Sequence, residues 1–167
     1  MYDKLTKSDI KKMEDEIEYR KLVVRKNAIE AVKEARAFGD LSENFEYYAA
    51  KRDKNKNESR IRYLERMIKT ANVIDDSSKD DEVGINNTVD IYFEEDDCVE
   101  TYRLVTTVRG NSLKGMISID SPIGKAIIGH KVNDRIYVEV NNNNGYYIVI
   151  KSITNTNDDS EDEIRKY

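Results

Sequence analysis

Two carboxylates, Asp40 and Glu43, stand three positions apart in the segment Ala37–Asn44. Magnesium is usually bound by one or two carboxylates together with waters and substrate oxygens. A pair of acids at this spacing could therefore complete a metal site that lacks ligands, without forming a site alone. The alternative is structural: Asp40 would cap a following helix, and Glu43 would close a capping box. Spacing alone leaves both interpretations open.

The segment before these acids has the apolar spacing of one long helix. Apolar residues recur at intervals of three, four or seven: Ile10, Met13, Ile17, Val24, Ala28, Ala31, Ala35 and Phe38. This face drifts by one heptad position between Met13 and Ala28, as it would along a nearly straight helix. Gly39 is a typical C-terminal stop, so the sequence predicts a helix over residues 7–38.

The segment after the acids repeats this pattern. One face carries the apolar residues Tyr47, Ala50, Ile61, Leu64, Ile68 and Ala71. The middle turns of that face carry Lys54 and Asn57 instead. A tight connection between two helices of similar length predicts an antiparallel pair. Residues 1–74 are therefore expected to form a coiled-coil hairpin with an acidic tip at residues 39–44, which suits a protein that acts on a partner's site.

Composition limits the class of protein. The chain has 167 residues, which allows one or two small domains. The single cysteine, Cys98, excludes a disulfide framework and fits a reducing compartment. No apolar run approaches the roughly 20 residues that span a bilayer, and no signal peptide follows Met1. We therefore expect a cytoplasmic protein with no membrane partner.

Charge is divided unevenly along the chain. The net charge is −5, but residues 1–74 carry +4 and the remaining residues carry −9. A basic hairpin on an acidic domain suits a protein of which only the hairpin approaches nucleic acid or another acidic surface. A solvated helical face would give the same charge, so charge alone does not decide between the two.

The second half of the chain has the alternating pattern of a sheet. Residues 75–81 are polar and acidic and are predicted to be a linker. Strands are predicted at residues 89–94, 99–106, 116–119, 136–140 and 146–150. The first two form one hairpin, and the last two form another around the turn Asn141–Gly145.

A short helix interrupts these strands. Ser121 and Pro122 have the types expected of its N-cap and first residue, and Gly129 stops it. The predicted fold class is thus α+β: an antiparallel helical hairpin, followed at residues 82–153 by a small antiparallel sheet with one short helix. Residues 154–167 are acidic and are expected to be disordered.

Two separate motifs resemble one known family. Residues 35–44, Ala-Arg-Ala-Phe-Gly-Asp-Leu-Ser-Glu-Asn, followed by Glu46-Tyr47 and residues 49–52, resemble the tip signature of the bacterial GreA/GreB transcript cleavage factors. Residues 119–129, Ile-Asp-Ser-Pro-Ile-Gly-Lys-Ala-Ile-Ile-Gly, resemble the Ser-Pro-Ile segment of the same family's C-terminal domain. The resemblance implies an FKBP-like fold for residues 82–153, without implying the isomerase activity of that fold.

The resemblance also implies a partner and a mechanism. Proteins of this family bind bacterial RNA polymerase and insert their coiled coil into its secondary channel, where the 3′ end of the nascent RNA lies after backtracking. Asp40 and Glu43 would help to hold a second Mg²⁺ in the polymerase active site. The protein would then have no cofactor of its own, and it would stimulate cleavage by the polymerase rather than act as an enzyme.

Roles for other residues follow from the same resemblance. Three residues would position the tip loop: Leu41, Ser42 and Asn44. Three cations would contact RNA or the channel wall: Arg36, Lys51 and Arg52. Three residues would dock on the polymerase: Asp120, Ser121 and Pro122. The protein is expected to act as a monomer.

Two alternative functions stay open at this point. An inhibitory homologue would occupy the same channel and block the site; extra acids or altered spacing at the tip would favour it, and this tip has neither. A prolyl isomerase of the FKBP type with a coiled-coil arm would need an aromatic-lined pocket. Residues 82–153 contain no Trp and only one Phe, Phe93, which disfavours that activity.

Overall fold

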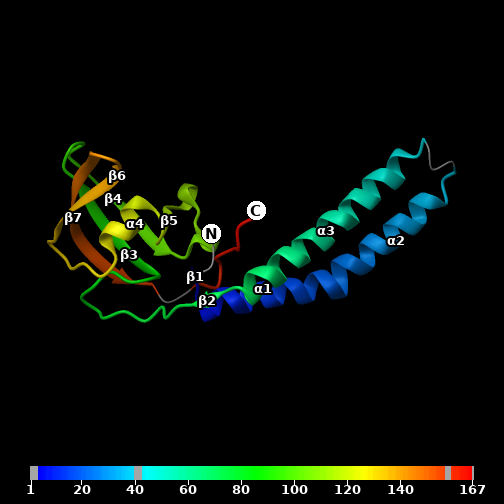
Figure 1. Cartoon of the computed structure of the whole chain (residues 1–167), viewed down its shortest axis with the longest axis horizontal. Coiled ribbons are helices and arrows are strands. Elements are labelled where there is room, and N and C mark those ends of the chain that lie inside the picture. Colours follow the sequence, from blue (N-terminus) through cyan, green and yellow to red (C-terminus); the bar gives the residue numbers. More distant parts are fainter. Residues whose placement is uncertain (1–3, 40–42, 157–158, 167) are drawn as a thin grey trace. The chain divides into compact units, whose positions relative to one another are not determined.

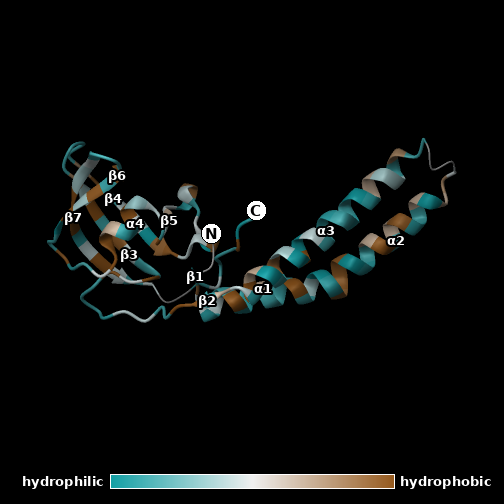
Figure 2. Cartoon of the chain, viewed as in Figure 1, coloured by the Kyte–Doolittle hydropathy of each residue, from teal (hydrophilic) through white to brown (hydrophobic). Residues whose placement is uncertain are grey.

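The computed structural model describes residues 4–39, 43–156 and 159–166 and divides them into two compact units. One unit is the helical segment Ile10–Asn72, and the other combines residues 4–9 with the described part of Val73–Tyr167. Figure 1 shows the elements of each unit, and Figure 2 shows polar and apolar residues alternating along the helices. Among the described residues, no helix is long and apolar enough to cross a membrane.

The first arm of the hairpin is helical from Lys7 to Arg36, in three consecutive parts. These are α1 (Lys7–Tyr19), a π-helical turn η1 (Arg20–Val24) and α2 (Arg25–Arg36). The π turn is defined by the Arg25 amide, which donates to the carbonyl of Arg20 five residues earlier. It lies where the sequence pattern drifts, so this interval contains a π turn and not the uninterrupted 3.6-residue helix that the pattern predicts.

The second arm is one helix, α3 (Phe45–Lys69), and α2 packs against it. The predicted hairpin is therefore confirmed, although the first arm ends two residues before the expected Phe38. The chain turns there because the Ala37 amide bonds to the Glu34 carbonyl, and because Gly39 adopts a φ of 117°, which favours glycine.

The middle of the hairpin is held together by polar side chains. Asn57 and Arg60 on α3 are 4% and 6% exposed. Arg60 Nε donates to Glu16 Oε1 at 2.9 Å, and Arg20 Nη1 donates to Asn57 Oδ1 at 3.0 Å. The Asn57 amide in turn donates to the Arg20 carbonyl at the π turn, at 3.3 Å. Asn57, a polar residue in the otherwise apolar face of α3, is thus the centre of a hydrogen-bonded network.

The second unit contains a five-stranded sheet in the order β5-β4-β3-β7-β6. Its strands are β3 (Asn87–Phe93), β4 (Cys98–Val105), β5 (Met116–Ser118), β6 (Arg135–Asn141) and β7 (Asn144–Asn155). The two predicted hairpins are confirmed. The sheet is mixed rather than antiparallel, because β5 lies parallel to β4, with Leu104 opposite Ile117.

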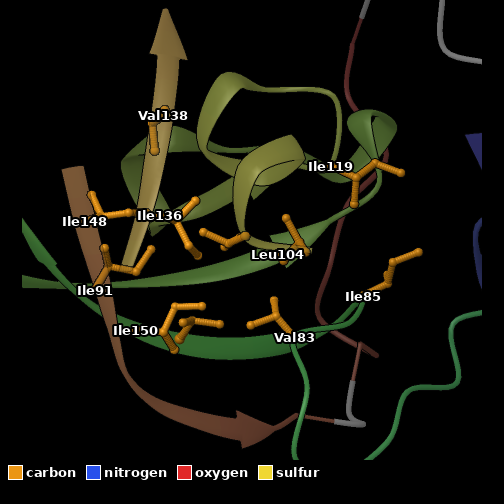
Figure 3. Close-up of a cluster of buried hydrophobic side chains, with 11 residues drawn as sticks. Val83, Ile85, Ile91, Leu104, Ile119, Ile136, Val138, Ile148 and Ile150 are labelled. Atoms are coloured by element: carbon orange, nitrogen blue, oxygen red, sulfur yellow. The ribbon is translucent and has the colours of Figure 1, made fainter. Parts of the chain in front are cut away.

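The core of this unit lies on one face of the sheet. It is a cluster of buried aliphatic side chains contributed mainly by the strands (Figure 3). The short helix α4 (Pro122–Ile127) adds Ile127 to this cluster. Helix α4 packs against β5 and β6. Alternate residues of β3, Val89 and Ile91, point into this core, as the period of two predicts.

The two ends of the described chain belong to this second unit. The N-terminal segment includes β1 (Lys4–Leu5), and the Ile74 amide, which follows β2 (Asn72–Val73), donates to the Leu5 carbonyl. The predicted hairpin domain of residues 1–74 ends close to the observed Asn72, but residues 4–9 lie outside the helical unit because they pack with the sheet domain. Residues 75–81 contain no helix or strand, as a linker would.

The C-terminal tail is ordered where the structure describes it, so the expectation of disorder over residues 154–167 is wrong for those residues. Strand β7 extends to Asn155, and the Arg165 amide donates to the Val108 carbonyl at 2.7 Å. Asp162 forms ion pairs with Arg103 at 2.8 Å and with Arg109 at 3.0 Å. Acidic composition predicts disorder only when no partner is available, and here two cations of the same unit compensate the acid.

Candidate functional site

Asn44 holds the two arms of the hairpin together beside the tip. It is the N-cap of α3, and its Oδ1 accepts from the Tyr47 amide at 3.0 Å. Its Nδ2 donates to the carbonyl of Ala35, in the last turn of α2, at 2.6 Å. One side chain thus accepts from a backbone donor at the start of α3 and donates to a backbone acceptor at the end of α2.

These contacts show which residue caps the N-terminus of α3. The N-cap is Asn44, so the interpretation in which Asp40 caps the helix and Glu43 closes a capping box is wrong. Glu43 precedes the cap, is exposed, and makes no ion pair with any residue that the structure describes. Its carboxylate is therefore not needed to hold α3. Asp40, Leu41 and Ser42 lie outside the described residues.

Two of the three predicted cations meet at one aromatic ring. The Arg36 guanidinium lies 5.6 Å from the centre of the Tyr47 ring, and Lys51 Nζ lies 6.0 Å from it. Hydrogen bonding with Arg36, together with the charges of Lys51 and Lys54, lowers the pKa of the Tyr47 phenol. The third cation, Arg52, is exposed on the same helix.

Tyr47 belongs to the apolar face and to the tip signature in the sequence, but neither pattern gave it a role in this site. It is half-buried beside the edge of the Tyr48 ring, at 5.6 Å between ring centres. Its spacing of four from Lys51 puts both on one helix face and could have indicated the contact. The cross-helix approach of Arg36 has no such local signal, because it depends on how the two arms are paired.

The second predicted site surrounds the start of α4. Ser121 is the N-cap: its Oγ accepts from the Gly124 amide at 3.0 Å and donates to the Ser118 carbonyl at 2.6 Å. Pro122 is the first helical residue. Both local predictions are confirmed, and this geometry is independent of any partner.

Asp120 is fixed in place just before this cap. Its Oδ2 accepts from the Thr107 hydroxyl at 2.8 Å, and its amide donates to Ser118 Oγ at 3.0 Å. Its Oδ1 lies 3.5 Å from Lys4 Nζ. The Asp120 side chain is 33% exposed, so one carboxylate oxygen is held by the domain while the group as a whole remains reachable from solvent.

The part of the chain that the structure describes contains no cluster of three or more acidic, histidine or cysteine side chains that could hold a metal ion. His130 Nδ1 instead lies 3.0 Å from Asp134 Oδ2. Partial burial and the nearby carboxylates of Glu100, Asp96 and Asp97 raise the pKa of the Cys98 thiol, which disfavours the reactive thiolate.

Two family models match the chain, one for each half. The model described as "Transcription elongation factor, N-terminal" matches residues 4–73, and the model described as "Transcription elongation factor, GreA/GreB, C-term" matches residues 78–155. Both describe the class of transcription elongation factors. The chain belongs to the GreA/GreB family of that class.

Two GreA sequences agree with this assignment. The chain is 46% identical over 137 residues to transcription elongation factor GreA of Thermoanaerobacter pseudethanolicus, covering 81% of this chain and 87% of that one. It is 40% identical over 135 residues to GreA of Bacillus subtilis, covering 81% and 86%. Among solved structures, GreA factor homolog 1 (Gfh1) of Thermus thermophilus is 23% identical, with a TM-score of 0.42 and coverage of 92% and 99%.

Proposed function

We propose that this protein binds bacterial RNA polymerase and stimulates the polymerase's own cleavage of backtracked RNA. Membership of the GreA/GreB family supports the partner and the process. The observation that carries the proposal is the role of Asn44 as the cap of α3, because α3 then does not use the Glu43 carboxylate as its cap within the part of the tip that the structure describes.

The tip acids suit a shared metal ion rather than a resident one. Two carboxylates are within the number that Mg²⁺ takes when waters and substrate oxygens complete its coordination. Asp40 and Glu43 would hold the ion when the tip is in the polymerase active site. A second Mg²⁺ there would activate the attacking water and stabilise charge on the phosphate, as in two-metal hydrolysis. The protein's contribution is to bring two acids and to orient them.

The other predicted residues near the tip would have two separate roles, which are to position the tip and to attract RNA. Leu41, Ser42 and Asn44 would set the tip's conformation, of which the Asn44 clamp to Ala35 is the described part. Arg36, Lys51 and Arg52 would attract the phosphates of the extruded RNA, since the hairpin half of the chain is basic.

Docking would be the task of the other unit. Asp120, Ser121 and Pro122 would bind the polymerase at the opening of the secondary channel, into which the hairpin is inserted. The fixed orientation of Asp120 supports this, because a preorganised carboxylate loses little conformational freedom on binding.

The test is RNA cleavage in stalled, backtracked complexes of the cognate polymerase. Asp40→Ala and Glu43→Ala should each lower the stimulated rate on the order of 10²-fold while polymerase binding is retained, because they remove one metal-ordering carboxylate. The matched control is Glu30→Ala, which removes an exposed acid from α2, away from the tip. Normal cleavage by both tip variants would contradict the proposed role of the acids. Binding that slows elongation without cleavage would instead indicate the inhibitory alternative.

A further inference from the structure

Two phenylalanines stand on either side of the tip with their rings in solvent. Phe38 follows the C-cap of α2 and is 72% exposed, and Phe45 opens α3 and is 86% exposed. A single exposed apolar side chain is ordinary. These two are not independent, because both line one open hollow together with Glu43, Asn44 and Glu46. Its volume is about 580 Å³, and it is open to solvent rather than enclosed.

The backbone that carries these rings is fixed by one carbonyl group. The Ala35 oxygen accepts from the Phe38 amide at 3.2 Å and from the Asn44 side chain at 2.6 Å. Phe45 directly follows Asn44, whose own carbonyl accepts from the Tyr48 amide at 3.2 Å. The two aromatic residues are therefore attached to hydrogen-bonded ends of both helices, so their backbone would need little ordering when a ligand binds.

The lining of the hollow favours a neutral aromatic ligand. Its described residues are two phenylalanines, one asparagine and two carboxylates, without a cation among them, so a phosphate would be repelled. The cations instead lie around Tyr47, where Arg36 and Lys51 approach the ring. Aromatic side chains beside a basic surface are the combination that binds single-stranded nucleic acid, with bases on the rings and phosphates on the cations.

We propose that Phe38 and Phe45 form a stacking site for an unpaired nucleobase of the extruded RNA. This rests on the proposed function, because that function brings RNA to the tip. The base would lie in the hollow lined by the two rings. The cations near the tip, Arg36 and Lys51 among them, would attract the RNA backbone. The site would hold the RNA 3′ segment against the tip and so position the phosphate that the tip acids address. Phe38 and Phe45 are positioning residues in this assignment.

A cycle of protein and RNA variants tests the contact. The cleavage rate at saturating protein is measured for the wild type and Phe45→Ala, on RNA with a normal base and with an abasic nucleotide near the 3′ end. Loss of stacking should lower the rate about tenfold on normal RNA, and the two proteins should cleave abasic RNA equally. Phe45→Tyr should retain the wild-type rate. Leu22→Ala, which removes another exposed apolar side chain from the hairpin, is the matched control.

Crosslinking supplies a readout that does not require cleavage. A 4-thiouridine near the RNA 3′ end of a backtracked complex should crosslink to the wild-type tip, and Phe38→Ala with Phe45→Ala should reduce the yield about tenfold. An equal loss of cleavage on normal and abasic RNA, with unchanged crosslinking, would overturn the proposal and indicate a contact with the polymerase wall. A wild type that crosslinks without stimulating cleavage would refute the proposed function and leave the stacking site supported.

Discussion

Arg109 Nε lies 2.6 Å from Asp9 Oδ1, although both side chains are fully buried. The same guanidinium donates to Asn86 Oδ1 at 2.8 Å and to Asp162 Oδ2 at 3.0 Å. Asp9 also accepts from the Thr106 hydroxyl at 2.7 Å. This single buried cation thus joins the N-terminal segment, the sheet and the C-terminal tail of one unit.

Breaking this ion pair should destabilise the sheet domain strongly. Asp9→Ala leaves Arg109 buried with less compensation, and such losses cost about 3–5 kcal/mol because the remaining charge stays out of water. The measurement is the free energy of unfolding by denaturant. Lys11→Ala is the control, since its pair with Asp15 is exposed and is expected to contribute less than about 1 kcal/mol. Equal effects of the two variants would mean that the Arg109 cluster is not stabilising.

The sequence predicted features that depend on residues close together in the chain better than contacts between residues far apart in it. The hairpin followed from the spacing of apolar residues, which is a local pattern that each helix repeats over many turns. The Arg109 cluster could not be predicted in this way, because Asp9 and Asp162 come from opposite ends of the chain. The tail was misjudged for the same reason: its acidity is evident in the sequence, but its cationic partners are not.

The tip illustrates a second limit. Asp40, Glu43 and Asn44 are all suitable capping or turn residues within five positions, so the sequence alone could not choose among them. Asn44 is the cap in the structure because its side-chain amide accepts from the Tyr47 amide and donates to the Ala35 carbonyl at the same time. A carboxylate can only accept. The start of α4 had no such competition, and there Ser121 and Pro122 were predicted correctly.

Glu16 should make the stability of the hairpin depend on pH. Its partial burial alone would raise its pKa, but hydrogen bonds from Arg60 and Arg20 and their charges outweigh this and lower the pKa below the ordinary 4.5. The stabilisation is therefore fully present above the ordinary value and is lost as pH falls through the lower folded-state pKa.

The test compares unfolding free energies of the wild type and Glu16→Gln at several pH values between neutral and about pH 3. The variant should be less stable at neutral pH by about 1.5–3 kcal/mol, and this difference should shrink on acidification. Glu14→Gln, which changes an exposed carboxylate on the same helix, should behave like the wild type. If the difference in unfolding free energy between the two proteins did not change with pH, the destabilisation of Glu16→Gln would not come from the lost charge.

Charge reversal of Lys51 and Arg52 should weaken action on backtracked complexes more than binding to complexes without extruded RNA. Both cations are exposed near the tip, where RNA phosphates would pass. The effect should shrink as salt rises, because exposed charges are screened beyond about 8 Å at physiological ionic strength. The salt dependence should flatten by about 0.7 in logarithmic slope for each RNA phosphate that the variant no longer neutralises. Lys26→Glu is the control for a charge reversal elsewhere on the hairpin. If the Lys51 and Arg52 reversals weakened action on both kinds of complex equally, these residues would contact only protein.

Asp120→Lys or Pro122→Ala should lower the affinity for polymerase and leave the cleavage rate at saturating protein close to that of the wild type. The hydrogen bonds from Thr107 and to Ser118 fix Asp120 in one orientation, so a contact made there stabilises the complex equally before and during the reaction. Binding is measured by titration, and melting of each variant shows whether the domain is intact. Glu139→Lys makes the same charge change on an exposed position of β6 and should bind normally. If a saturating variant with a normal melt remained slow, docking would be coupled to the chemical step, and the division of roles between the two units would be wrong.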